Sequence, residues 1–264
     1  MRFRPFSHRA VALVAVVFGI GALAACQPVK TPVAPADCTQ YWRGYVLPTD
    51  HNYAGLGAYN GSDRYMCKPT PWQGVRAQVQ HLRNYADAGA THSNLGSVFE
   101  PRPKYDEAAF DNFPLQGSAP SWIDLNGKWA VPGTTYGQTI VGIFNEMRVY
   151  NNLTPVPVDT TATITGYNDL TADQIAAYVI AVYTKNPTWV WKPEIGPVEL
   201  AQVFLDQGSQ VLVRGDLAFC QSILETTWFA WPNSPPPAPP PASAQSTDPV
   251  IAGYYELQHV RSRN

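Results

Sequence analysis

Apolar residues recur at helical spacing along five segments of this chain, which predicts a mainly α-helical fold. The first predicted helix begins at Pro71, and Gly89 supplies its stop signal. Its apolar face comprises Val75, Val79, Leu82 and Ala86. The second begins at Tyr136, and its inward face comprises Ile140, Val141, Phe144 and Met147.

Capping signals place the next two helices. Thr171 followed by Gln174 has the spacing of a capping box, and the helix that it opens is expected to stop before Pro187. A proline at the first helical position is favourable, so a further helix is expected to open at Pro197. Gly208 supplies the stop signal for that helix.

The fifth helix is predicted over residues 214–229 and carries one glutamate, Glu225, with Asp216 as its N-cap. Glu225 lies on the flank of a narrow apolar stripe. The stripe comprises Leu217, Cys220, Leu224 and Trp228. Burial between apolar walls raises the pKa of a carboxyl, which would let Glu225 stay protonated near neutral pH and donate a proton. From the pattern alone, the alternative is a solvated glutamate on a helix flank.

Residues 1–25 have the pattern of a targeting segment. Three arginines precede an apolar run, residues 10–25, that is short for a membrane span of about 20 residues. The run ends in L-A-A-C at Cys26, which resembles the lipobox of bacterial lipoproteins. This resemblance implies cleavage before Cys26, lipidation of its thiol, and an extracytoplasmic location anchored to a bacterial membrane. Ordinary secretion with cleavage nearby is the alternative.

Composition divides the rest of the chain. We expect one folded domain over residues 38–232, made of the parts 38–150 and 164–232. The segments outside regular structure are a Pro/Ala-rich tether (26–37), a linker (151–163), a Pro-rich loop (233–249) and a C-terminal tail (250–264).

Charge and aromatic content restrict the partners. The net charge is −2 and no basic stripe occurs, so nothing indicates nucleic-acid binding. Aromatic residues make up 12% of the chain against 14% charged residues, which suits stacking on sugar rings, although an aromatic-rich core accounts for at least half of them. We find no metal, phosphate-loop or nucleophile-elbow motif, and expect no cofactor, no metal and a monomer.

Three cysteines follow Cys26. Cys38 and Cys67 flank a loop-rich segment, and in an oxidising compartment we expect a disulfide between them, with two free thiols as the alternative. Cys220 falls on the apolar stripe of the fifth helix and is expected to be an inert thiol.

The segment around Glu225 resembles a motif of bacterial glucosaminidases, the peptidoglycan hydrolases of glycoside hydrolase family 73. Residues 214–229, RGDLAFCQSILETTWF, are similar to the family's R-G-D-x-A-F-A-Q-S-x-x-E-T-G-x-F. Glu225 falls on the family's catalytic acid. Cys220 and Thr227 depart from the pattern, where the family has Ala and Gly.

Three further blocks carry the resemblance. Residues 52–57, NYAGLG, resemble the family's cleft-lining N-F-A-G-I-G, and residues 74–82, GVRAQVQHL, resemble G-V-R-A-Q-I-Q-H-L. Residues 122–136 resemble the L-x-G-x-W-A-x-P-x-x-x-Y block, whose tyrosine the family places near the reaction centre. That tyrosine corresponds to Tyr136, for which a plain core position is the alternative.

The resemblance implies a fold, an activity and a site. The fold would be lysozyme-like, mainly α (α+β), with short strands near the cleft. The activity would be hydrolysis of the β-1,4 bond between N-acetylglucosamine and N-acetylmuramic acid in peptidoglycan strands, with Glu225 as general acid and Tyr136 beside it. The implied substrate-binding residues are Tyr53, Gly55, Trp129, Gln221, Trp228 and Phe229.

A second catalytic group is left open. Asp216 is about 13.5 Å up the same helix from Glu225, which is too far for a catalytic pair. The other candidate acids are Asp63, Asp124 and Glu256. Assistance by the acetamido group of the substrate is the alternative to a second acid.

The order of the motifs differs from the family. The family has the glutamate helix first, whereas this chain has it last, which we interpret as a circular permutation with residues 151–163 joining the old ends. The alternative is two separate half-domains. The altered order, Thr227 and the missing second acid also keep open a non-catalytic envelope lipoprotein that binds glycan.

Overall fold

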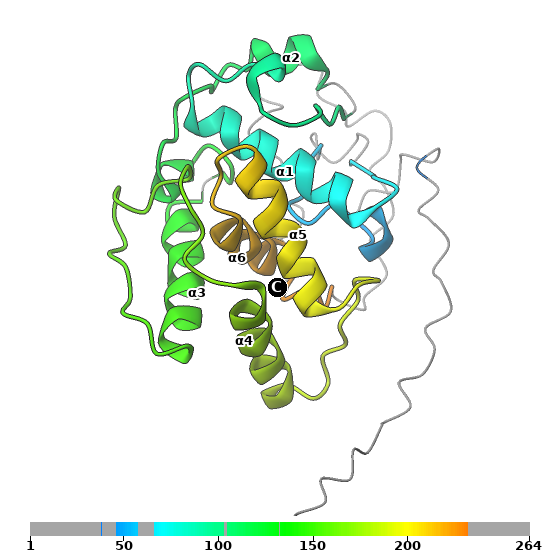
Figure 1. Ribbon diagram of the computed structural model, residues 1–264, viewed down its shortest axis with the longest axis vertical. Coiled ribbons are helices and arrows are strands. Elements are labelled where there is room, and N and C mark those ends of the chain that lie inside the picture. Colours follow the sequence, from blue (N-terminus) through cyan, green and yellow to red (C-terminus); the bar gives the residue numbers. More distant parts are fainter. Residues whose placement is uncertain (1–37, 39–45, 58–65, 103–104, 132, 232–264) are drawn as a thin grey trace, which may run out of the picture. The chain divides into compact units, whose positions relative to one another are not determined.

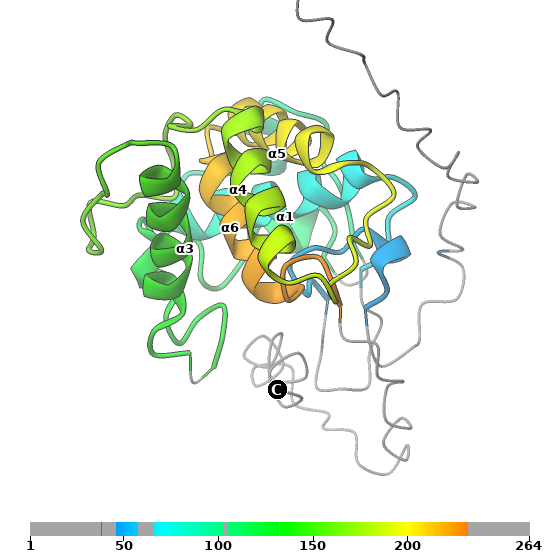
Figure 2. The ribbon, with the colours of Figure 1, turned by 90° about the horizontal axis from the view of Figure 1, so that it is seen from below.

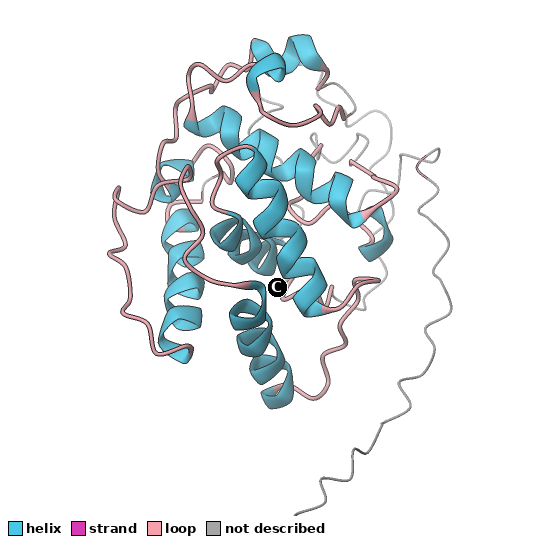
Figure 3. Ribbon diagram, in the orientation of Figure 1, coloured by secondary structure: helices cyan, strands magenta, loops and turns pink. Residues whose placement is uncertain are grey.

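The structure, a computed structural model, describes residues 38, 46–57, 66–102, 105–131 and 133–231. These residues belong to one compact unit, residues 33–264. The described part is mainly helical, as predicted (Figure 1; Figure 3). Its α-helices are α1 (Pro71–Ala86), α2 (Glu107–Asp111), α3 (Tyr136–Tyr150), α4 (Ala172–Lys185), α5 (Pro197–Gln210) and α6 (Gly215–Glu225). Short 3-10 turns are η1 (Pro48–Asp50), η2 (His92–Asn94) and η3 (Trp122–Leu125).

The expected short strands are not found in this part of the chain, where extended backbone pairs only as isolated bridges. Thr165 bridges Val213, and Ser121 bridges Thr163. The segment around Thr163 does alternate, with Ala162 and Ile164 buried between threonines, but it pairs with its neighbours only through these isolated bridges. Among the described residues, no helix is both long enough and apolar enough to span a membrane.

The capping signals predicted helix starts better than helix ends. Thr171 caps α4 through the expected box with Gln174. The first helix begins at Pro71 as predicted but ends at Ala86, because Asp87 leaves the helical conformation and pairs with the Arg83 guanidinium at 2.6 Å. The helix α5 continues two residues past Gly208.

The helix α6 occupies the centre of the unit. It packs against α1, α3 and α5 (Figure 1; Figure 2). Every residue of α6 except Leu224 is buried. The predicted apolar stripe was therefore wrong, since a helix surrounded by other helices is buried on all faces. Leu224, which the stripe placed inside, is the partly exposed one.

Two glycines permit the close approach of elements to one another. A Cβ on Gly215 would lie 2.1 Å from the Phe204 carbonyl oxygen of α5, and a Cβ on Gly74 would lie 1.9 Å from the carbonyl oxygen of His51. Both separations are far shorter than atoms tolerate, so only glycine lets α6 rest on α5 and the residue 51–57 loop rest on α1.

Asp216 has a different role from the predicted N-cap. The N-cap position is Arg214, and Asp216 lies in the first turn, fully buried. Its carboxylate accepts the backbone N–H of Asp169 at 2.6 Å and of Leu170 at 3.3 Å, and pairs with Arg214 at 3.1 Å. Asp216 thus ties the start of α6 to the segment that leads into α4.

Candidate active site

The site is built where the end of α6 meets the start of α3. The Tyr136 hydroxyl donates a hydrogen bond to Glu225 Oε1 at 2.5 Å, across 89 residues of sequence. Tyr136 is fully buried, and Glu225 is 7% exposed. The glutamate is therefore not solvated on a helix flank. A tyrosine and a glutamate that the resemblance placed in one reaction centre are direct partners in the structure.

Two glutamines extend this pair into the protein interior. Gln221, one turn before Glu225 on α6, donates from Nε2 to the Tyr136 oxygen at 2.9 Å. Gln78, on α1, donates from its own Nε2 to Gln221 Oε1 at 2.8 Å and to the Ala218 carbonyl oxygen at 3.3 Å. Three helices thus contribute to one buried chain of hydrogen bonds that ends on Glu225.

Gln221 was predicted to bind substrate, and this prediction is corrected. The side chain is fully buried, and its amide group is hydrogen-bonded to Tyr136 and Gln78. Gln78 and Ser222, whose hydroxyl lies 3.1 Å from Gln78 Oε1, lie in the quoted motifs but were not predicted to be site residues. One signal could have found this face, since Gln221 and Glu225 stand at i and i+4 and therefore share one side of the helix.

The backbone directly after Glu225 takes an unusual path. Thr227, Trp228 and Phe229 have φ angles of 52°, 61° and 57°, all in the left-handed region. The helix therefore ends at Glu225 instead of continuing to Phe229 as predicted. Hydrogen bonds hold the turn, including Trp228 N–H to Ile223 O at 2.8 Å and Ala230 N–H to Thr227 O at 3.1 Å.

Left-handed backbone is costly for residues with a side chain, about 1–2 kcal/mol each. Such outliers persist where the surrounding structure enforces them, and they gather at functional sites. Here the turn returns Phe229 to the core, where its ring centroid lies 5.0 Å from that of Trp191. Thr227 occupies the position at which the resembling family has glycine, the residue that this conformation suits best.

Most of the other predicted substrate-binding residues are buried. Tyr53 and Trp129 are each 1% exposed and Phe229 is fully buried, so none of them offers a face to a sugar ring. Gly55, with φ 65°, also lies in buried backbone. These four assignments are corrected to core positions. Trp228 is half-buried and keeps part of its surface exposed.

Trp129 belongs to an aromatic cluster around His81. The rings of Tyr85, Tyr105, Phe113 and Trp129 lie with their centroids 5.0–5.2 Å from the imidazole. Burial and the Arg102 charge hold the pKa of His81 well below its usual range. His81 is therefore a neutral core histidine. Among the described residues, no group of three or more His, Cys, Asp or Glu side chains could hold a metal ion.

The loop that resembles the cleft-lining segment is held on α1 by polar contacts. The Asn52 side chain closes the loop by donating a hydrogen bond to the Leu56 carbonyl at 2.8 Å and accepting one from the Leu56 N–H at 2.9 Å. Tyr53 then reaches the turn after α6, with its ring centroid 6.0 Å from that of Phe229. A segment from the first part of the chain thereby contacts the residues that follow Glu225.

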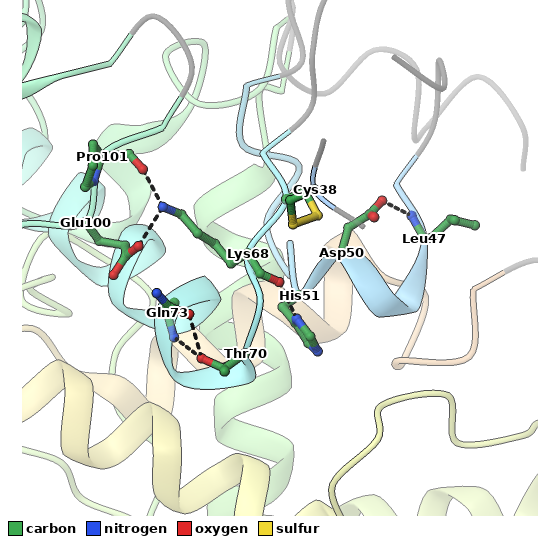
Figure 4. Close-up of a disulfide and its surroundings, with 10 residues drawn as sticks. Cys38, Leu47, Asp50, His51, Lys68, Thr70, Gln73, Glu100 and Pro101 are labelled. Atoms are coloured by element: carbon green, nitrogen blue, oxygen red, sulfur yellow. Dashed lines mark hydrogen bonds and ion pairs between the residues drawn. A yellow bond between two sulfur atoms is a disulfide. The ribbon is translucent and has the colours of Figure 1, made fainter. Parts of the chain in front are cut away.

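Cys38 and Cys67 are joined in a disulfide with a Cα separation of 5.4 Å (Figure 4). Next to it, Lys68 forms a buried ion pair with Glu100 at 2.6 Å and donates to the Pro101 carbonyl (Figure 4). Cys220 is a free, fully buried thiol, and its burial raises its pKa well above the usual range. Cys26 lies outside the described residues.

The described candidates for a second acid, Asp124 and Asp216, are bonded to groups other than Glu225. Asp124 caps η3, where it accepts the Ser121 hydroxyl at 2.6 Å and the Ser121 N–H at 3.0 Å. Asp216 is engaged with Arg214 at the opposite end of α6. Asp63 and Glu256 lie outside the described residues.

Comparison with known proteins adds little about function. No family model matches the chain, and no solved structure matches it. An uncharacterized protein of Borreliella burgdorferi is 32% identical over 113 residues, which cover 42% of this chain and 48% of that protein. The chain thus spans about half the length of this relative. The geometry of Tyr136 and Glu225 remains the main guide to function.

Proposed function

We propose that this protein is a peptidoglycan hydrolase, an endo-β-N-acetylglucosaminidase, with Glu225 as its general acid. One observation carries the proposal. The two residues that the motif resemblance assigns to the reaction centre, from motifs 89 residues apart, form a 2.5 Å hydrogen bond in a nearly dry environment. Glycosidases of this kind need a carboxylic acid that protonates the leaving oxygen.

The chemistry follows from the two carboxyl oxygens. Tyr136 occupies Glu225 Oε1, so the proton to be donated resides on Oε2. Its transfer to the glycosidic oxygen accompanies cleavage of the C1–O bond. Water then supplies the hydroxyl at C1 and returns its other proton to the Glu225 carboxylate, which restores the acid. With Asp124 and Asp216 both engaged elsewhere, the substrate's acetamido oxygen is the proposed group that stabilises C1 before water arrives.

The proposal includes a lysozyme-like fold in circularly permuted order. Its support is that α1 and α3, from the first part of the chain, both pack on α6 from the second part. Residues 151–163 contain no helix, as a joining segment would. Contact between the Tyr53 loop and the turn after Glu225 agrees with the two parts forming one site and not two half-domains.

A lipid anchor at Cys26 would place the enzyme at the membrane surface beside its glycan substrate. The resemblance of the residues before Cys26 to a lipobox carries this part of the proposal. Peptidoglycan strands are the proposed partner.

A second candidate function is a non-catalytic lipoprotein that binds glycan. The engagement of Asp124 and Asp216 away from Glu225 favours it, as does the partly exposed aromatic surface of Trp228. Such a protein would retain the fold and bind peptidoglycan without cleaving it.

Product analysis separates these functions. Purified peptidoglycan is incubated with the protein, and the reducing ends of soluble fragments are identified by mass spectrometry after borohydride reduction. New ends at N-acetylglucosamine support the proposed enzyme, whereas new ends at N-acetylmuramic acid contradict the glucosaminidase assignment. Sedimentation of the protein with peptidoglycan, without new ends, supports the binding lipoprotein.

A further inference from the structure

We infer that Gln78 and Gln221 are positioning residues that fix the direction of the Tyr136 hydroxyl, so that its proton always faces Glu225. This inference rests on the proposed function for its catalytic meaning. It gives a role to two polar side chains that are fully buried, in a core of otherwise mostly apolar residues.

The direction of the chain is set by one backbone carbonyl. The Ala218 oxygen can only accept a hydrogen bond, so the Gln78 atom 3.3 Å away is the amide nitrogen. The same nitrogen lies 2.8 Å from Gln221, which must present its oxygen there. The Ser222 hydroxyl lies 3.1 Å from Gln78 Oε1 and 3.2 Å from the Ala218 carbonyl oxygen, so it can donate its single proton to either.

The orientation of Gln221 decides that of Tyr136. With its oxygen held by Gln78, Gln221 presents its NH₂ group to the Tyr136 oxygen at 2.9 Å. Tyr136 therefore accepts from Gln221, and its own proton is directed to Glu225 Oε1. A free tyrosine hydroxyl could rotate, or donate to a carbonyl oxygen instead. The two glutamines remove those choices.

The consequence concerns the proton affinity of Glu225. A hydrogen bond donated to a carboxylate favours its charged form and opposes the effect of burial. Chains of hydrogen bonds also polarise one another in a dry interior. Loss of either glutamine should weaken the donation and make Glu225 harder to ionise.

Several other ionisable groups on α6, α1 and α3 are engaged with other partners. On α6, Asp216 pairs with Arg214 and Cys220 faces Met147 at 3.8 Å. On α1, Arg83 pairs with Asp87 and Arg76 with Gln207, while His81 lies in its aromatic cluster. On α3, Glu146 accepts from Tyr178, and Arg148 pairs with Asp169.

The test measures the ionisation of Glu225 directly. The full-length protein is labelled with ¹³C at the glutamate side-chain carboxyls, and the Glu225 signal is assigned as the one missing from Glu225→Gln. Its titration midpoint is then compared in the wild type, Gln78→Leu, Gln221→Leu and Tyr136→Phe. Gln207→Leu is the matched control, since Gln207 is also buried but bonds Arg76 on the α1–α5 side.

We expect Gln78→Leu and Gln221→Leu to raise the midpoint in the same direction as Tyr136→Phe, with Gln207→Leu unchanged. A midpoint unchanged in both glutamine variants, while Tyr136→Phe raises it, would overturn the inference. The midpoint reports on folded molecules, so reduced stability does not mimic the effect. Raised midpoints in a protein that cleaves no glycan would leave the inference intact and refute the proposed function alone.

Discussion

Tyr136 and Glu225 face each other across the contact between α3 and α6, and the phenol donates a hydrogen bond to Glu225 Oε1 at 2.5 Å. Tyr136 begins its helix and Glu225 ends the other, so two helix termini meet at one point. Backbone groups near helix ends lack partners within the helix, and side chains there are less enclosed by neighbouring turns. Glu225 is therefore held by the core and retains only 7% exposure.

Removing the Tyr136 hydroxyl should slow catalysis more than it affects folding. Hydrogen bonds to charged groups are worth about 1.5–3 kcal/mol, so Tyr136→Phe should lower kcat about tenfold to a hundredfold. The measurement is the initial rate of release of new reducing ends from peptidoglycan. Tyr85→Phe is the control, because it removes a buried hydroxyl within the His81 cluster and should leave kcat unchanged. Equal rates for Tyr136→Phe and wild type would remove Tyr136 from the mechanism.

Thr227→Gly should stabilise the protein. A threonine at φ 52° carries left-handed strain that glycine does not, and this gain exceeds the added flexibility of the unfolded chain, giving about 0.5–1 kcal/mol. Urea unfolding monitored by circular dichroism measures the change. The matched control is Thr139→Gly in the right-handed helix α3, where glycine should destabilise the protein. A loss of stability in Thr227→Gly would show that the turn is not strained.

Acidification should destabilise the fold through His81. Its pKa is lowered in the folded state by burial and by Arg102, so the unfolded chain takes up a proton that the native state does not. The free energy of unfolding is therefore not reduced by His81 above the unfolded-state pKa of about 6.5, and it decreases as the pH falls below that value. Between pH 7 and 5 the loss should approach 2 kcal/mol, which is roughly the effect of one proton over that range.

The unfolding free energy of His81→Phe, measured at both pH values, checks this assignment. The phenyl ring keeps the aromatic contacts and cannot titrate, so the variant should lose less stability on acidification than the wild type. Phe113→Leu, which alters the same aromatic cluster without removing a titratable group, is the control and should keep the wild-type slope. The assignment fails if His81→Phe and wild type respond equally to acid.

The disulfide should account for a large part of the stability. It closes a loop with a sequence separation of 29 between Cys38 and Cys67, and the loss of loop-closure entropy predicts about 3–4 kcal/mol. The double variant Cys38→Ser/Cys67→Ser should show this decrease in urea unfolding. A reductant should destabilise the wild type by a similar amount and leave the double variant unchanged. If the reductant also destabilised the double variant, the loss of stability would not come from the Cys38–Cys67 disulfide.

The sequence predicted those parts of the fold that local signals control. Thr171 with Gln174, and proline at positions 71 and 197, were sufficient to place helix starts. Helix ends depended on tertiary contacts, as Asp87 shows by pairing with Arg83 where α1 stops. The short helix α2 was not predicted, because it lies in a segment rich in proline and glycine.

The site was predicted unevenly for a similar reason. The motif resemblance singled out Glu225 and Tyr136, and the structure brings these two side chains together. Whether an aromatic residue faces a substrate or the core depends on what packs against it, and only the structure placed Trp129 beside His81 and Tyr53 beside Phe229. A buried helix also has no polar face to reveal its orientation, which is why the stripe through Leu224 was misplaced.

The most direct test of the proposed function is the turnover of Glu225→Gln on purified peptidoglycan. The substitution keeps the size of the side chain and removes its proton, so kcat should fall by about 10²- to 10⁴-fold while thermal unfolding changes little. Glu199→Gln, an exposed glutamate in the first turn of α5, should retain the wild-type rate. Cleavage by Glu225→Gln at the rate of Glu199→Gln would contradict the assignment of Glu225 as the general acid.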